Sequence, residues 1–186
     1  MVHQLMSTHD IGCWSETHGA KGRCDTWRNP PGCLSWWSPG PSAATAGVGI
    51  TIRQDFLRHF DNYHPEVLFP GRALRLRLTG AQGSLDIISV YFPTGDSTHE
   101  DDIREAGFEV NGRRVSNFEL REALCRRLAM RIRPRDQVVT AIAGDFNFVV
   151  NPLDRLCTSS CKSTGGAGSS RSCPLARPRR DAFRIP

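Results

Sequence analysis

Four polar residues stand at the ends of apolar, β-type stretches of the sequence. Glu16 follows the short run at 11–14, Tyr91 lies near the end of "LDIISVYFP", and Asp145 and Asn147 follow "VVTAIAG". Side chains at the ends of several strands can converge at one rim of a sheet. Carboxylates there suit a hard cation such as Mg²⁺ or Mn²⁺, which can activate water. Amide and phenol donors can hold phosphoryl oxygens as charge develops, so the set could hydrolyse a phosphodiester.

Each of these residues also has an ordinary structural interpretation. Glu16 fits an exposed turn residue, and Tyr91 fits a core or rim residue. A Gly-Asp-x-Asn sequence is often a turn closed by hydrogen bonds from side chain to backbone. If the segment stays extended instead, Asp145 and Asn147 point to one side and Phe146 points to the core. The extended geometry is the one that would place both polar groups in one site.

The elements that must position these residues are short strands and helices. The sequence predicts the end of a helix before residue 10, strands at 11–14, 34–37, 47–52, 72–78, 85–92 and 138–143, and a helix at 117–133. In the strand at 72–78 three Leu residues alternate with Arg75 and Arg77, which we expect on an exposed face. Strands in antiparallel pairs with helices between them predict an α/β layered domain.

The helix at 117–133 has the clearest signals for its ends. Leu residues repeat every four positions, and Ser116 followed by Glu119 predicts a capping box. Val115 and Leu120 fit a hydrophobic staple, and Pro134 ends the helix. We expect the Arg residues of this helix to form a solvated face; they are Arg121, Arg126, Arg127 and Arg131.

Composition limits the class of protein. No apolar run reaches the roughly 18 residues that span a bilayer, and no signal peptide is visible, so we expect a nuclear or cytoplasmic protein without a membrane anchor, not a secreted one.

Seven Cys without a C-x-x-C pair favour free thiols over a structural zinc site. Residues 157–186 carry six basic residues and one acidic residue, which equals the net charge of +5 of the whole chain. We expect this segment to be a disordered basic tail, so the charge says little about the folded part.

Three blocks of the sequence resemble motifs of the endonuclease/exonuclease/phosphatase superfamily. "DIGCWSETH" resembles the family pattern D-I-x-x-L-Q-E-T-H, and "GRALRLRL…LDIISVYFPTG" resembles its central hairpin ending in Y-x-P-N. "AIAGDFNFVVNPLDR" resembles G-G-D-F-N-x-x-x-N-P-x-D-R. The blocks keep the family order over about residues 5–156. The last block is most similar to the endonuclease domains of non-LTR retrotransposons and AP-endonuclease-like proteins.

The resemblance implies a partial four-layer α/β/β/α sandwich with mixed, mostly antiparallel sheets, over a domain of residues 1–156. It also implies a divalent-metal-dependent phosphodiester hydrolase with nucleic acid, DNA in particular, as its substrate. Glu16 matches the family's metal-ligand Glu, and Tyr91 its phosphate-contacting Tyr. Asp145 matches the Asp that positions or deprotonates the attacking water, and Asn147 matches the Asn that orients that Asp and contacts phosphate.

The sequence departs from the family pattern at several positions. Ser15 replaces the usual Gln before Glu16, and Thr94 replaces the family's Asn. All six His precede Asp145, so none can take the place of the family's terminal His, and the family's Asn-bearing first strand would precede Val2. We therefore expect a truncated domain that is weakly active or inactive. The alternative is a non-catalytic, retroelement-derived fragment or a nucleic-acid-binding remnant.

Overall fold

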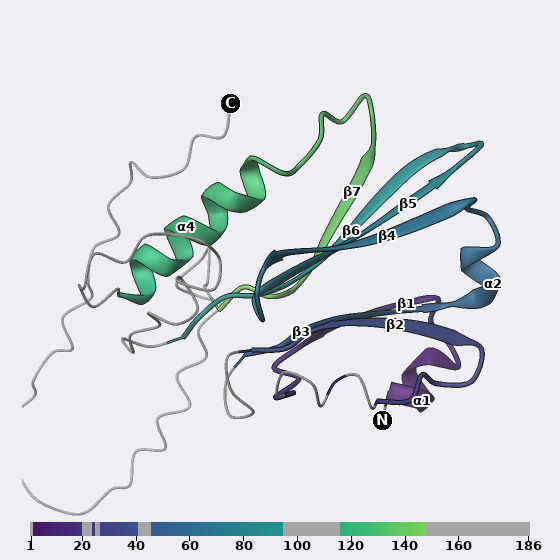
Figure 1. The fold of residues 1–186 in the computed structure, drawn as a ribbon, viewed down its shortest axis with the longest axis horizontal. Coiled ribbons are helices and arrows are strands. Elements are labelled where there is room, and N and C mark those ends of the chain that lie inside the picture. The colour runs from purple at the N-terminus through teal and green to yellow at the C-terminus, as the bar shows by residue number, and fades with distance from the viewer. Residues whose placement is uncertain (1, 20–23, 25–26, 41–45, 95–115, 148–186) are drawn as a thin grey trace, which may run out of the picture. The chain divides into compact units, whose positions relative to one another are not determined.

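The structure is a computed structural model that describes residues 2–19, 24, 27–40, 46–94 and 116–147, all within one compact unit, Met1–Phe148 (Figure 1). The domain boundary expected at 156, the basic tail at 157–186 and the staple residue Val115 lie outside these residues. In the described part, no helix is both long and apolar enough to cross a bilayer.

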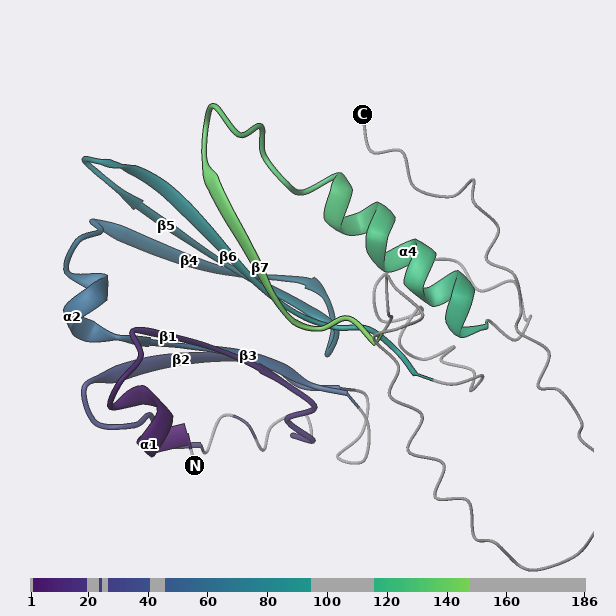
Figure 2. The ribbon, with the colours of Figure 1, turned by 180° about the vertical axis from the view of Figure 1, so that it is seen from behind.

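Two β-sheets and a small number of helices make up the described unit. In chain order its elements are α1 (Val2–Met6), β1 (Ile11–Ser15), β2 (Cys33–Ser38), β3 (Val48–Arg53), α2 (Gln54–Leu57), β4 (Asn62–Phe69), β5 (Ala73–Gly80), β6 (Gly83–Tyr91), α4 (Asn117–Ala129) and β7 (Val139–Asp145). The first sheet has the order β1-β3-β2 and is antiparallel throughout. The second has the order β4-β5-β6-β7, in which β7 runs parallel to β6. Figures 1 and 2 show the two sheets face to face.

Apolar residues at every second position fill the space between the sheets. Leu74, Leu76 and Leu78 of β5 are 1% exposed or less and pack on β3, because alternate side chains of a strand point to the same face. The buried residues of this core are Ala46, Val48, Ile50, Ile52, Leu57, Leu74, Leu76, Leu78, Ile87 and Tyr91. The alternation predicted for β5 is confirmed for its apolar face.

Helix α4 covers the other face of the second sheet. Leu120 and Leu124 are fully buried against Ile88 and Val90, in a core separate from the one between the sheets. On the outer face of the first sheet, α1 places the buried Met6 beside β1. The layers therefore follow the expected order α/β/β/α, in a mixed α/β fold.

The ends of α4 follow only part of the prediction. The capping box is present: the Glu119 N–H donates to Ser116 Oγ, and the Glu119 carboxylate accepts from the Ser116 N–H at 2.9 Å. The helix ends at Ala129, four residues before the expected end, and a turn at 130–131 follows; Pro134 disfavours helical backbone at Arg133. The chain crosses the sheet through α4, which makes β7 parallel to β6, so the expectation of antiparallel pairs is wrong for these two strands.

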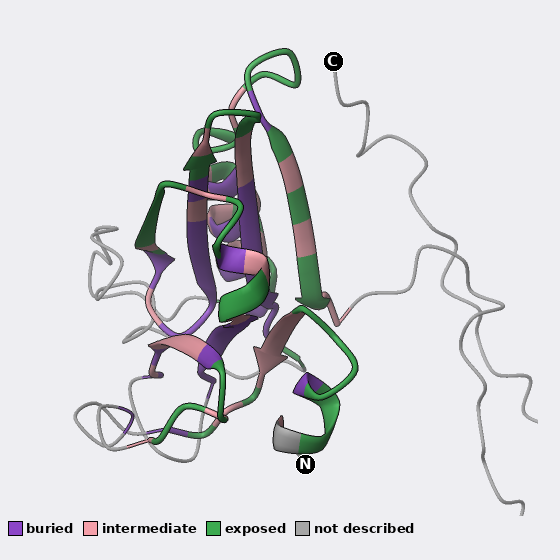
Figure 3. Cartoon of the chain, turned by 90° about the vertical axis from the view of Figure 1, so that its right-hand side faces the viewer, coloured by how far each residue is buried: buried purple, intermediate pink, exposed green. Residues whose placement is uncertain are grey.

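Burial differs sharply between neighbouring strands of the second sheet. Figure 3 shows long buried stretches in the centre of the sheet, whereas β7 alternates between exposed and half-buried residues. Val139 is 66% exposed, so β7 forms an open edge in the described structure. The opposite edge strand, β4, was missed because Pro65 interrupts its pattern; Pro is tolerated at an edge, where its missing N–H has no partner to lose.

The polar face of β5 is not exposed, contrary to expectation. Arg75 is only 5% exposed, because the segment after α4 folds over it. Its guanidinium forms an ion pair with Glu66 and donates to the Arg131 carbonyl at 2.9 Å. Buried charge is therefore compensated by local partners rather than by water.

Asp86 of β6 lies in the same polar layer and is 1% exposed. It forms ion pairs with Arg77 and Arg133, each at 3.1 Å. Burial alone would raise the pKa of Asp86, but the hydrogen bonds and charges of both guanidinium groups outweigh it and hold that pKa below its usual value. The ion pairs tie the segment after α4 to the sheet.

Candidate functional site

Three strand ends bring the four sequence-predicted residues together. Strand β1 ends immediately before Glu16, β6 ends at Tyr91, and β7 ends at Asp145. Tyr91 is paired with Asp145 across the parallel strands, and its hydroxyl donates a hydrogen bond to Glu16 Oε1. Asn147 donates its backbone N–H to Asp145 Oδ1 at 2.9 Å. The ends of β1, β6 and β7 are therefore linked through Tyr91, which bonds Glu16 by its hydroxyl and pairs with Asp145 by its backbone.

Glu16 owes its direction to an irregularity at the end of β1. Ser15 still pairs with Val48, but the next N–H to bond that side is Thr17, which donates to the carbonyl of Gly47, the residue before β3, at 3.1 Å. Glu16 is thus an extra residue on its strand, as in a β-bulge, and its φ is +51°. A left-handed backbone at Glu costs about 1–3 kcal/mol and is found mostly where function or packing requires it.

The segment from Asp145 to Asn147 is a turn, so of the two geometries considered from the sequence the extended one is not present. Asn147 has a φ of +49°, and the Asp145 carboxylate accepts its N–H, which is the side-chain-to-backbone turn considered as the ordinary alternative. Phe146 packs on the α4 core beside Phe92, as expected. The hydrogen bond joins the Asn147 backbone to the Asp145 carboxylate, while the Asn147 side chain donates to the Phe92 carbonyl.

Gly144 allows β7 to approach β6 closely just before the turn. Its φ is +139°, and a Cβ at this position would stand 2.0 Å from the Val90 carbonyl oxygen. Only glycine fits such a position without moving the neighbouring backbone. The Gly-Asp-x-Asn sequence therefore serves strand packing as well as the turn.

Side chains from outside the four residues anchor the segment that follows Tyr91. Arg121 of α4 donates from Nε and Nη2 to the Pro93 carbonyl, at 2.9 and 2.6 Å. Asn117 donates to the Thr94 carbonyl, and Asn147 Nδ2 donates to the Phe92 carbonyl at 2.7 Å. Three consecutive carbonyls are held in this way, which fixes the rim of the site.

The expectation of a solvated Arg face on α4 is therefore wrong in part. Arg121 holds the site segment, and Arg127 donates to the Leu68 carbonyl at 3.3 Å. Arg126 is exposed and pairs with Glu122 along the helix, as expected. No pattern in the sequence marks Asn117 or Arg121, because their partners lie more than twenty positions away in the chain.

Tyr91 lies at the centre of several charges. Burial raises the pKa of its hydroxyl most, the hydrogen bond and charge of Glu16 raise it further, the Arg72 guanidinium lowers it, and Asp145 raises it. Arg72 is 2% exposed, and its Cζ lies 4.8 Å from the centroid of the Tyr91 ring. The phenol therefore stays protonated at neutral pH and can donate a hydrogen bond.

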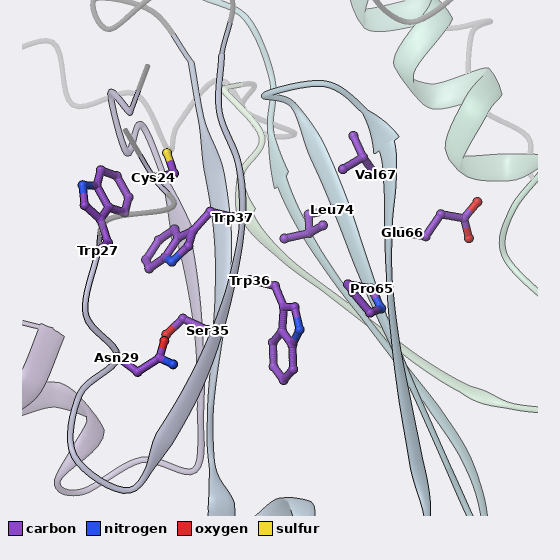
Figure 4. A pocket seen from close by; sticks show the side chains of 10 residues that line it. All are labelled: Cys24, Trp27, Asn29, Ser35, Trp36, Trp37, Pro65, Glu66, Val67 and Leu74. Atoms are coloured by element: carbon purple, nitrogen blue, oxygen red, sulfur yellow. The ribbon is translucent and has the colours of Figure 1, made fainter. Parts of the chain in front are cut away.

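Two cavities adjoin the first sheet in the described structure. One, of about 620 Å³, lies beside Glu16 and has Trp14 and Trp37 in its wall. The other, of about 480 Å³, is lined by Trp36 of β2 and Pro65 of β4 (Figure 4), and none of the four predicted residues lines it. Of the four predicted residues, Glu16 lines the first cavity, and Tyr91, Asp145 and Asn147 line neither of the two.

The donor set suits one hydrated hard cation. Glu16 bonds the Tyr91 hydroxyl, Asp145 pairs with Tyr91 on the neighbouring strand, and Mg²⁺ is often held by one or two carboxylates while it keeps several waters. Among the described residues, no group of three or more His, Cys, Asp or Glu could hold a metal. The arrangement fits a weak, water-rich site and does not fit a closed structural one.

No protein-family model and no curated protein matches this sequence. Among solved structures, the chain is similar to the AP endonuclease LMAP from Leishmania major, with a TM-score of 0.50 and 15% identity. The match covers 77% of this chain and 48% of that chain, so the present chain spans about half the length of the protein it matches. At this identity the likeness concerns the fold, which is a mixed α/β fold like that of an AP endonuclease.

Proposed function

We propose that the chain contains the core of a divalent-metal-dependent phosphodiester hydrolase of the endonuclease/exonuclease/phosphatase superfamily, with DNA as its substrate. The observation that carries the proposal is the Tyr91 hydroxyl, which bonds Glu16 and stands beside Asp145 at the end of three strands. Three motif blocks in family order support it, and so does the fold shared with a protein described as an AP endonuclease.

Each residue then has a defined role. Glu16 would hold a hydrated Mg²⁺ or Mn²⁺ ion, which when bound supplies positive charge to the phosphoryl oxygens. Asp145 orients or deprotonates the attacking water, and the Asn147 N–H holds the Asp145 carboxylate in place. Tyr91 is protonated, so once the cation occupies Glu16 its hydroxyl can donate to a phosphoryl oxygen.

We expect slow turnover from this set of groups. A site in which one or two carboxylates hold the cation binds Mg²⁺ weakly, because Mg²⁺ gives up its waters reluctantly. A second candidate, a non-catalytic nucleic-acid-binding remnant, is favoured by the sparse donor set, with no three-ligand group in the described structure. Nucleic-acid binding without any metal-dependent cleavage would support this second candidate.

The direct test is nicking of supercoiled plasmid by the purified chain in Mg²⁺. Asp145→Ala is expected to slow nicking by at least about 100-fold, and EDTA to abolish it. Asp136→Ala removes an exposed carboxylate from the turn before β7 and is the matched control, with an unchanged rate expected. Equal rates for Asp145→Ala and the wild type would remove Asp145 from the mechanism and indicate a contaminating nuclease.

A further inference from the structure

The cavity of about 620 Å³ beside Glu16 has no role in the mechanism above. Three of the four Trp of the chain line it, and each of these three indoles is half-buried. We call it the Trp cavity; the wall residues used below are Trp14, Glu16, Trp27, Arg28, Asn29 and Trp37. Its volume is in the range of small-molecule sites, and apolar side chains gathered at a surface often mark an interaction site.

Glycines place two of the indoles against the outer face of the first sheet. Trp14 of β1 and Trp37 of β2 both pair with Gly49 of β3, and residues that lie opposite each other in antiparallel strands point to the same face. A Cβ at Gly49 would stand 2.2 Å from Trp37 Cε3, so this indole lies directly over the glycine. A Cβ at Gly12 would stand 2.6 Å from Trp14 Cζ2. Larger residues at the two glycines would push the indoles off the sheet.

Neighbouring residues fix the orientation of the indoles. Trp14 Nε1 donates to Thr51 Oγ1 at 2.9 Å, and Thr51 shares a further hydrogen bond of 2.9 Å with Ser35. Trp27 stands edge-on to Trp37, with ring centroids 4.8 Å apart and an angle of 85° between the planes (Figure 4). Rings that are already held in place lose little side-chain freedom when a ligand binds, which favours binding.

The polar residues of the wall indicate the kind of ligand. Asn29 is exposed and offers an amide to the hydrogen-bonding edge of a base, and Arg28 is exposed and offers a guanidinium to a phosphate. Glu16, the proposed metal ligand, lines the same cavity. A nucleobase on a phosphate backbone combines a flat apolar face, a polar edge and an anion, so it matches this wall.

We infer that the Trp cavity binds an unpaired base of the DNA strand that is cut. Stacking on aromatic side chains needs the face of a base, which a base inside a duplex shares with its neighbours, so the substrate class is single-stranded or locally unpaired DNA. Negative supercoiling favours strand separation, so a supercoiled plasmid offers such bases as well. The inference deepens the proposed function and rests on it for the source of the base. Binding itself requires neither metal nor turnover.

The test is the binding of an end-labelled thymidine oligonucleotide of about eight nucleotides, followed by fluorescence anisotropy in EDTA. An abasic oligomer of the same length has the same phosphates and no bases, and we expect it to bind at least about fivefold more weakly, because stacking is lost. Equal affinity for the two oligomers would overturn the inference, and so would the absence of thymidine oligomer binding. Displacement of the oligomer by an equal concentration of thymidine monophosphate would indicate a free nucleotide as ligand and would also overturn it.

Trp37→Leu and Trp36→Leu form a matched pair of variants. Both residues are half-buried indoles of β2, but they lie on opposite sides of the strand (Figure 4), and Trp36 packs toward the core between the sheets. We expect Trp37→Leu to weaken binding of the thymidine oligomer at least about fivefold and Trp36→Leu to leave it unchanged. Trp37→Phe keeps an aromatic face and should recover most of the affinity.

An equal loss of affinity in Trp37→Leu and Trp36→Leu would overturn the inference, because it would indicate general destabilisation. Circular dichroism checks that the variants fold. If Trp37→Leu does not fold, Trp27→Leu takes its place with the same expected loss, because Trp27 lies outside the strands.

Plasmid nicking separates this inference from the proposed function. Base-dependent binding that Trp37→Leu weakens, without Mg²⁺-dependent nicking by the wild type, would keep the base site and reject the hydrolase. Nicking that depends on Asp145, by a chain that binds the thymidine and abasic oligomers equally, would keep the hydrolase and reject the base site.

Discussion

Gly144→Ala perturbs the point where β7 meets β6 next to the site. A Cβ at Gly144 would stand 2.0 Å from the Val90 carbonyl oxygen and 2.9 Å from two further Val90 backbone atoms, at a φ of +139°. Backbone atoms cannot rotate away as a side chain can, so the pairing of Val90 with Gly144 must open. Overpacking of this kind costs about 1–3 kcal/mol, and a left-handed φ on Ala adds about 1–3 kcal/mol.

Gly83→Ala provides the matched control for the backbone strain. Gly83 has a φ of +129° at the start of β6, just after the β5–β6 turn, and a Cβ there meets nothing within 4 Å. It therefore carries the strain without the clash, and we expect Gly144→Ala to lose at least about 2 kcal/mol more unfolding free energy than Gly83→Ala. Urea unfolding followed by circular dichroism measures both. Equal losses of unfolding free energy in the two variants would show that β7 does not approach β6 as described. The position of Asp145 beside Tyr91 would then be wrong as well.

Three further outcomes follow from the same contacts. The ion pairs of Asp86 lower its pKa in the folded state, so the ionised carboxylate stabilises the fold at pH values above its ordinary pKa of 3.8, and this stabilisation is lost as the pH falls through the lower pKa of the folded state. The urea midpoint of the wild type should therefore drop at acid pH, and it should drop less in Asp86→Asn. Ser116→Ala removes the cap of α4 and should cost about 1 kcal/mol in urea unfolding. Asn147→Gly should be more stable than Asn147→Ala, because Gly accepts the φ of +49° while both lose the hydrogen bond to Phe92; equal unfolding free energies would contradict the turn.

Local patterns predicted the elements whose signals are contained in a few neighbouring residues. The alternation of Leu74, Leu76 and Leu78 gave one face of β5, and Ser116 with Glu119 gave the start of α4. The four site residues were found because each follows an apolar strand-like run, and the strand ends do meet. Their catalytic and metal-binding roles stay predictions.

The rest depends on contacts that a linear pattern does not contain. Arg75 alternates as an exposed residue would, yet α4 and the segment after it cover this face of β5. Glu16 points to Tyr91 through a bulge and a left-handed φ, and Asn147 reaches Asp145 through a turn rather than along a strand. Arg72 lies over a ring nineteen positions later in the chain, a contact that no local pattern contains.

The central proposal is that Glu16 holds a hydrated cation beside Tyr91, with the Asp145 carboxylate close enough to act on its water and to favour its binding. Mn²⁺ binding to the purified chain, followed by the electron paramagnetic resonance signal of the free ion, tests this without requiring turnover. We predict that Glu16→Gln and Asp145→Asn each weaken binding by at least about tenfold, while Asp136→Asn leaves it unchanged. Identical Mn²⁺ affinity in the wild type and in both site variants would contradict the account.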